Sequence, residues 1–181
     1  HRRLNSVPEA VRLPALLRKS RDYQAEVSTT LSGQVLEALF ELARGFQSAD
    51  EKSGHTLLAD TWRRDPQEIY GGLITTLLRM VFLLYAEDRG LMPSGDLYQR
   101  NYSVQGLFEK LRADHEKYPD LMDERYAAWP QLLALFRAVH TGCKHRKMTL
   151  PARQGHLFDP DRFPFLKVGL ARRSRPIRNP V

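Results

Sequence analysis

The sequence contains a single cysteine, Cys143, among its 181 residues. One cysteine cannot form an intrachain disulfide, and such sparse use of cysteine is typical of a reducing compartment. The sequence also lacks a positively charged lead followed by an apolar stretch and a small-residue cleavage site, so no secretory signal is visible. We therefore expect a cytoplasmic protein. Because the first residue is His1 rather than Met, we interpret the chain as a fragment of a longer protein.

Long uninterrupted hydrophobic runs are absent as well. The most apolar stretch, Leu73 to Ala86, is interrupted by Thr75, Thr76 and Arg79. It is shorter than the ~20 residues that a membrane-spanning helix needs. We expect no membrane contact and interpret this run as a helix that is buried on several sides.

Recognisable catalytic motifs are missing. The chain has no glycine-rich phosphate loop, nucleophile elbow or His-Glu-x-x-His sequence. Glu87 and Asp88 are paired carboxylates, but adjacent helical residues point ~100° apart because one turn takes ~3.6 residues, so a structural role is favoured. The acidic group Asp120, Asp123 and Glu124 lacks the strand pattern that would carry a metal-dependent nuclease site.

The sequence contains only a weak signal for a metal site. His140, Cys143 and His145 lie close together, and His156 is a distant fourth residue. A structural zinc site normally uses four ligands in two well-spaced pairs, so a helix end followed by a polar turn is the favoured interpretation. We assign no catalytic, cofactor-binding or metal-binding residue to this chain.

Basic residues concentrate at the two ends of the chain, whose net charge is +7. Residues 1–21 carry six basic residues and one acidic residue, 167–181 carry five basic and no acidic residues, and 22–166 carry 17 basic and 20 acidic residues. We expect a basic lead at 1–20, a helical domain at 21–166, and a disordered or interrupted basic tail at 167–181. Such basic clusters bind the negatively charged phosphate backbone of DNA, so any DNA contact is expected from the two ends of the chain. The residues expected to make it are Arg18, Lys19, Arg21, Lys167, Arg172, Arg173, Arg175 and Arg178.

Helical periodicity dominates the rest of the chain. Apolar residues from Val27 to Phe46 recur at steps of three and four, which predicts a helix closed by a polar loop at Ser48–Gly54. A short helix is expected over Thr56–Arg63. Further helices are predicted at Val104–Lys117, after Ser103, and at Tyr126–His140.

The longest predicted helix is Pro66–Arg89, and sequence signals mark both of its ends. Asp65 can cap it, Pro66 suits the first helical position, and Glu68 stands where a capping box needs an acid. Gly90 can adopt the left-handed conformation that ends a helix, and Pro93 prevents its resumption. Gly71 and Gly72 near the start suggest that another backbone packs closely there.

For the interior of this helix and its C-terminal end, the sequence predicts which side chains are buried and which partners the charged residues have. We expect burial of a set of apolar residues: Leu77, Met80, Val81, Leu84 and most of Phe82 and Leu83. Arg79 is expected to be buried and paired with Glu37 or Glu41. Glu87, Asp88 and Arg89 are expected to hold the helix exit by hydrogen bonds to the turn after Gly90, as structural rather than catalytic residues.

No segment alternates at period two, and the stretch after Gly142 is rich in turn residues. Four apolar side chains are expected to hold that stretch in place: Leu157, Phe158, Phe163 and Phe165. The predicted fold class is all-α, an irregular multi-helix bundle around one long buried central helix with a turn-rich C-terminal segment.

Four stretches together resemble a known family: "RDYQAEVSTTLSGQVLEALFEL", "DPQEIYGGLITTLLRMVFLLYAEDRGLMP", "YSVQGLFEKL" and "LPARQGHLFDPDRFPFL". In this order they are similar to the helical, non-catalytic region of large DNA adenine methyltransferases of restriction-modification and phage-defence systems. That family includes type IIG restriction enzymes and the methyltransferases of the BREX and DISARM systems. The resemblance covers about residues 21–166.

The resemblance implies a scaffold that positions catalytic and DNA-recognition domains of the parent protein. The implied partners are DNA and an adjoining methyltransferase domain, and the implied cofactor of the parent is S-adenosylmethionine. The family's Asn/Asp-Pro-Pro-aromatic motif, cofactor glycines and nuclease motif have no match in this chain. A self-sufficient nucleic-acid-binding module that uses the basic ends remains the alternative, followed by a small enzyme built on Glu87 and Asp88.

Overall fold

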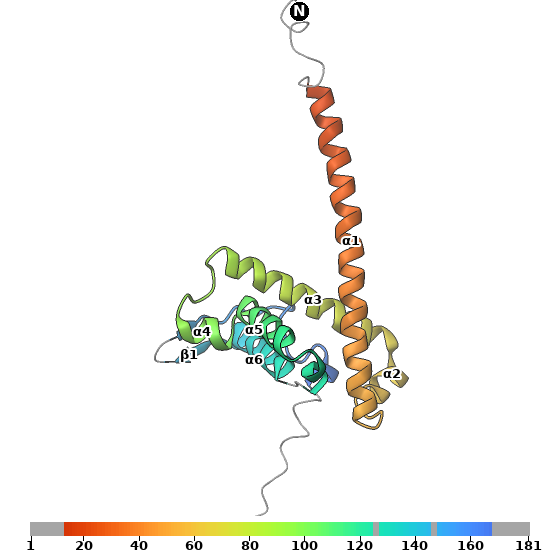
Figure 1. The fold of residues 1–181 in the computed structure, drawn as a ribbon, viewed down its shortest axis with the longest axis vertical. Coiled ribbons are helices and arrows are strands. Elements are labelled where there is room, and N and C mark those ends of the chain that lie inside the picture. Colours follow the sequence, from red (N-terminus) through yellow and green to blue (C-terminus); the bar gives the residue numbers. More distant parts are fainter. Residues whose placement is uncertain (1–12, 125–126, 146–147, 168–181) are drawn as a thin grey trace, which may run out of the picture. The chain divides into compact units, whose positions relative to one another are not determined.

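The computed structural model describes residues 13–124, 127–145 and 148–167. Helices make up most of this part of the chain, which confirms the all-α expectation (Figure 1). In chain order the elements are α1 (Leu13–Lys52), α2 (Ala59–Arg64), α3 (Pro66–Asp88), α4 (Asp96–Asn101), α5 (Val104–Lys117), η3 (Pro119–Glu124), α6 (Ala128–Thr141), β1 (Cys143–His145), β2 (Met148–Leu150) and η4 (Pro164–Lys167).

The chain divides into two compact units inside α1, the first ending at Arg44 and the second beginning at Gly45. The described residues of the first unit all belong to α1, which is continuous through the domain boundary expected at residue 21. Its end at Lys52 corrects the expected polar loop at Ser48–Gly54. The sequence from Ser48 to Lys52 contains Ala, Glu and Lys, which are good helix formers, so the helix continues for one more turn.

The turn that follows α1 is organised by Asp50. Its carboxylate accepts hydrogen bonds from the backbone N–H groups of Leu57 (2.8 Å) and Leu58 (2.9 Å) and lies 3.2 Å from Nδ1 of His55. Burial alone would raise the pKa of Asp50, but the hydrogen bonds from Leu58, His55 and Leu57 outweigh it and lower that pKa below its ordinary value.

The two ends of α3 follow the local signals in the sequence. The Asp65 side chain accepts from the backbone N–H of Gln67 at 2.9 Å, and Gly90 adopts a φ of 65° just beyond the helix. The predicted capping box was wrong, because the Glu68 side chain does not accept from the N–H of Asp65. Glu68 contacts Arg64 at 3.2 Å, while the Asp65 N–H donates to the carbonyl of Thr61.

The burial expected along α3 is largely wrong. Leu83 is fully buried, but Val81 is 62% exposed, Leu84 is 44% exposed, Phe82 is exposed, and Leu77 and Met80 are half-buried. The buried face carries residues that sequence hydrophobicity does not single out: Ile69, Gly72, Leu73, Thr75, Thr76, Arg79, Leu83 and Ala86. Apolar residues therefore cover both the inner and the outer face of this helix.

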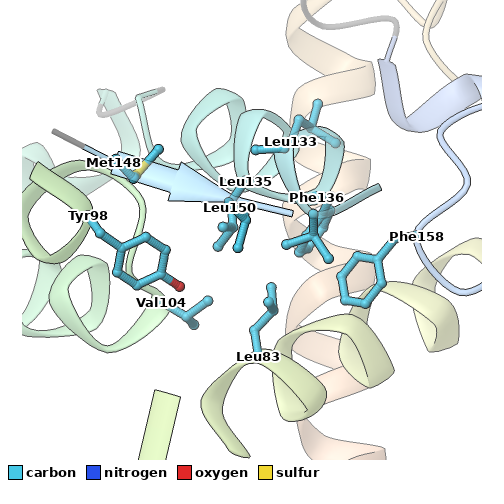
Figure 2. Packing of buried hydrophobic residues seen from close by; sticks show 11 residues of the cluster. Leu83, Tyr98, Val104, Leu133, Leu135, Phe136, Met148, Leu150 and Phe158 are labelled. Atoms are coloured by element: carbon cyan, nitrogen blue, oxygen red, sulfur yellow. The ribbon is translucent and has the colours of Figure 1, made fainter. Parts of the chain in front are cut away.

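The short elements after α3 pack around Leu83. Helix α5 begins and ends as predicted, and the Ser103 side chain caps it by accepting from the N–H of Gly106 at 3.0 Å. Helix α6 begins at Ala128 and ends at Thr141, close to the predicted bounds. Figure 2 shows side chains from α3, α4, α5, α6, β2 and the C-terminal segment converging on one core: Leu83, Tyr98, Val104, Leu133, Leu135, Phe136, Met148, Leu150 and Phe158.

A β-hairpin lies in the region where no strand was expected. Strands β1 and β2 pair antiparallel, with Cys143 opposite Leu150 and His145 opposite Met148. Met148 and Leu150 are buried while Thr149 between them is exposed. This alternation spans only three residues, which is too short for period-two patterning to be recognised in the sequence.

The segment after the hairpin is held in place by aromatic residues, as predicted. Phe158, Phe163 and Phe165 are buried, and the two last rings pack against the glycine pair at the start of α3. A Cβ atom placed on Gly72 would lie 2.5 Å from Cζ of Phe165. The glycines therefore admit two phenyl rings, rather than the neighbouring backbone that the sequence suggested.

By length and composition α3 could also cross a membrane. Its most apolar 18-residue window has a mean hydropathy of 1.6, so the apolar segment is longer than the sequence reading allowed. The core helix of a soluble protein has the same properties, and buried Arg79 lies midway along it. The absence of membrane contact stays a prediction.

Candidate functional site

The charged end of α3 is organised around the carboxylate of Glu87. Its Oε1 accepts hydrogen bonds from the hydroxyl of Tyr98 (2.7 Å) and the backbone N–H of Val104 (2.8 Å). Its Oε2 accepts from the hydroxyl of Ser103 (3.0 Å) and the backbone N–H of Gln105 (3.0 Å). Glu87 thus joins the C-terminal end of α3 to helix α4 and to the N-terminus of α5.

This arrangement leaves the carboxylate saturated. Two carboxylate oxygens offer about four acceptor positions, and each oxygen of Glu87 receives two donors. The negative charge also lies at the positive end of the α5 dipole. Burial raises the pKa of Tyr98, and its hydrogen bond to the Glu87 carboxylate raises that pKa further. Both effects favour the protonated hydroxyl, which donates to Glu87.

Asp88 and Arg89 point away from this network. The Asp88 side chain is 78% exposed and lies 3.8 Å from Nε of Arg89. The Arg89 guanidinium lies 5.2 Å from the ring centre of Tyr85. Glu87 and Asp88 do not converge on one point, as the helical geometry predicts. The expectation that this group bonds to the turn after Gly90 was wrong, because Glu87 bonds to α4 and α5 instead.

Arg79 is the second charged residue inside the unit, and it is only 3% exposed. Its Nε donates to the carbonyl of Leu157 at 2.5 Å, and Nη2 donates to the carbonyl of Asp159 at 2.9 Å. The guanidinium also lies 5.3 Å from the ring centre of Phe136. Burial lowers the pKa of Arg79, while the charge of Asp159 raises it. Arg79 fastens the C-terminal segment to the middle of α3.

The predicted acidic partners of Arg79 were wrong. The hydrogen bonds of Arg79 go to backbone carbonyls, and Glu41 pairs with Arg44 on its own helix at 2.8 Å. Glu37, the other predicted partner, is an exposed residue of α1. Backbone carbonyls accept the hydrogen bonds of a buried guanidinium, and they leave no trace in the sequence.

An open hollow of about 580 Å³ lies at the C-terminal end of α6. It is lined by His140, Thr141, Gln154, Gly155, His156 and Asp159. The backbone N–H of Gln154 donates to the carbonyl of His140 at 3.2 Å, so the loop caps α6. Gln154 has a φ of 46°, which is strained for a residue with a side chain.

The hollow was not expected from the sequence, although two of its histidines, His140 and the more distant His156, were weighed there as members of a zinc pattern. Nδ1 of His140 is buried and has no hydrogen-bond partner within the described part of the chain. Gly155 was the one available signal, because glycine marks turns. The hollow is open to solvent, and its geometry singles out no chemistry.

The structure does not bring the residues of the possible zinc pattern together. Across residues 13–124, 127–145 and 148–167, no group of three His, Cys, Asp or Glu side chains is arranged to hold a metal ion. His145 is exposed on β1, and Cys143 is half-buried on the same strand. The backbone of the acidic group at 120–124 lies on η3.

The basic residues expected to contact DNA are only partly described. Arg18, Lys19 and Arg21 are exposed on α1. Lys167 at the end of η4 donates to Asp161, and this bond lowers the pKa of the Asp161 carboxyl. The remaining four residues, Arg172, Arg173, Arg175 and Arg178, lie outside the described residues.

S-adenosylmethionine, the cofactor implied for the parent protein, is not assigned to any residue of the described part of the chain. Nucleotide cofactors of α/β folds bind beyond the carboxyl ends of parallel strands, next to a glycine-rich turn. The sheet in the described part of the chain is one antiparallel pair of three-residue strands.

A comparison with known protein families, with curated proteins and with solved structures finds no match for this chain.

Proposed function

We propose that this chain is the helical scaffold of a DNA N6-adenine methyltransferase or restriction-modification protein, and that it positions catalytic and DNA-recognition domains outside this chain. One observation carries the proposal. Three of the four stretches that resemble the family are joined to one another by their charged and aromatic residues.

Three contacts make up this network. Arg79, from the stretch "DPQEIYGGLITTLLRMVFLLYAEDRGLMP", bonds to Leu157 and Asp159 of the last stretch. Glu87, from the same stretch, bonds to residues 103–105 of the third stretch. The rings at 163 and 165 fill the space over the paired glycines. The most distinctive residues of the resemblance therefore have structural partners, as a scaffold requires.

The charged residues of this network are poorly suited to catalysis. A general base needs a free lone pair directed at its substrate, and the Glu87 oxygens already receive four donors. Arg79 is buried and bonded to backbone carbonyls. In this proposal S-adenosylmethionine belongs to the adjoining methyltransferase domain, and no residue of this chain is assigned to it.

Two experiments test the scaffold role. The 181-residue chain is incubated with DNA and S-adenosylmethionine labelled at its methyl group, and we expect no incorporation above a heat-killed control. Reading the parent gene beyond the codon for Val181 should reveal a glycine-rich cofactor motif and an Asn/Asp-Pro-Pro-aromatic motif in the same frame. Incorporation by the chain alone, or a parent gene without these motifs, would sink the proposal.

DNA binding through the basic ends is the second candidate. It is favoured by the exposure of Arg18, Lys19 and Arg21 within one turn of α1. Binding that neutralises several phosphates weakens steeply with salt. A gel-shift series from low to high salt should then show binding that is lost on deleting residues 1–20 and 167–181. Failure to bind even at low salt removes this candidate and leaves the scaffold role untouched.

A further inference from the structure

The outer face of α3 carries an exposed apolar stripe, which we define as Tyr70, Ile74, Leu77, Leu78, Val81 and Tyr85. Tyr70, Leu78, Val81 and Tyr85 are exposed, and Ile74 and Leu77 are half-buried. The stripe consists of two adjacent rows with a spacing of four residues, which form the ridges by which helices pack. No charged residue interrupts it, because Arg79 lies on the buried face. A partner for this stripe must therefore be apolar along its whole length.

The stripe is palindromic. Reversing the direction of the helix exchanges Tyr70 with Tyr85, Ile74 with Val81, and Leu77 with Leu78. Each exchange replaces a residue by one of the same kind, aromatic, β-branched or leucine. In a two-fold symmetric interface, residue i of one copy contacts residue j of the other copy, and residue j contacts residue i. The surface must therefore complement itself, as this stripe does.

The charges beyond the stripe complement one another in the same arrangement. Arg64, at the end of α2, contacts Glu68 and has a side chain that is 67% exposed. Asp88, at the other end of α3, lies 3.8 Å from Arg89 and is also exposed. An antiparallel pair places the arginine of one copy near the aspartate of the other, twice. It also sets the positive end of each helix dipole beside the negative end of its neighbour.

We infer that α3 pairs antiparallel with α3 of a second copy of this chain through the stripe, with the two-fold axis between Leu77 and Leu78. Six side chains from each copy form a contact much smaller than a standard specific interface, which has about 20–30 residues a side. The dimer is accordingly weak and depends on concentration. This inference is independent of the proposed scaffold role.

Light scattering over roughly 1–100 µM, the range in which a contact of this size dissociates, tests the pairing. The full chain should approach twice its mass of 20.9 kDa with rising concentration. Val81→Glu should weaken dimerisation at least tenfold, because it buries two carboxylates in the stripe. Phe108→Glu is the matched control, since Phe108 is equally exposed but lies on α5, and it should leave the dimer intact.

A mixing experiment tests the register. Tyr70→Lys and Tyr85→Glu each place charge opposite a tyrosine and should be monomeric alone, but their mixture sets lysine opposite glutamate and should dimerise. Both positions are exposed, so circular dichroism should show unchanged folding. The inference is overturned by a wild-type chain that stays monomeric, including one that instead cosediments with phosphatidylcholine vesicles. It is equally overturned by a dimer that survives Val81→Glu or by mixed variants that remain monomeric.

Discussion

Glu87 and Asp88 are chemically similar neighbours whose surroundings differ completely. Glu87 receives two hydroxyl and two backbone donors, whereas Asp88 is directed into solvent. Replacing a carboxylate that satisfies several donors leaves those donors unpaired, while replacing an exposed one changes little. The structural role expected for the whole Glu87-Asp88-Arg89 group therefore falls on Glu87.

Glu87→Gln should lower the free energy of unfolding by roughly 2–4 kcal/mol, because the amide NH₂ group faces N–H and O–H donors. Asp88→Asn is the matched control and should change it by less than about 0.5 kcal/mol. Urea unfolding of both variants measures the difference. Equal effects of the two substitutions would show that the Glu87 network does not stabilise the fold.

Asp50 should make stability depend on acid pH. Its pKa is lowered in the folded chain from an ordinary value of 3.8, so its contribution is fully present above that value. The contribution is lost as the pH falls through the lower folded pKa. In urea unfolding at a series of pH values, the gap between wild type and Asp50→Asn should be constant at neutral pH and shrink in acid. A gap that does not change with pH contradicts this account, and Asp96→Asn, at a fully exposed carboxylate, serves as the control.

At the scale of elements, α3 is apolar on almost every side but has a defined inner face. Leu83 is 0% exposed and Leu84 is 44% exposed, although the two residues are chemically identical. Leu83→Ala should therefore cost ~2–5 kcal/mol, the range for emptying a core position. Leu84→Ala should cost less than about 1 kcal/mol. Thermal melts compare the two, and a larger loss from Leu84→Ala would mean that the inner face has been placed wrongly.

The glycine pair in α3 is a packing feature. Gly72→Ala should destabilise the unit by ~1–3 kcal/mol, because the new methyl group would overlap the ring of Phe165. Gly45→Ala, inside helix α1, meets no atom within 4 Å. It should stabilise by ~0.5–1 kcal/mol, the usual gain when glycine leaves a helix interior. Chemical unfolding should thus show opposite signs for the two variants, and a stabilised Gly72→Ala would contradict the close packing.

At the scale of the whole molecule, apolar residues are exposed in both units. On α1 the exposed large apolar side chains of the first unit include Leu31, Val35, Leu36 and Phe40. In the second unit, the stripe on α3 is likewise exposed.

The sequence by itself determined the local features of this chain. Caps act over three or four residues, so Asp65, Ser103 and Gly90 fixed the ends of α3 and α5 with little help from the rest of the chain. Amphipathic periodicity likewise predicted α6 and the helical class. The aromatic residues after Gly142 indicated an ordered segment, because isolated large apolar side chains in a turn-rich stretch need a core to pack against.

Only the tertiary structure decided which partners the buried residues take. A helix that is apolar all round carries no periodic signal for its inner face, so Leu83 and Leu84 could not be told apart. The carbonyls that bind Arg79 come from residues 78 and 80 positions away. The donors to Glu87 lie 11 to 18 positions away, and two of them are backbone N–H groups. Backbone groups are the same in every residue, and only the folding of the chain brings particular ones to a buried charge.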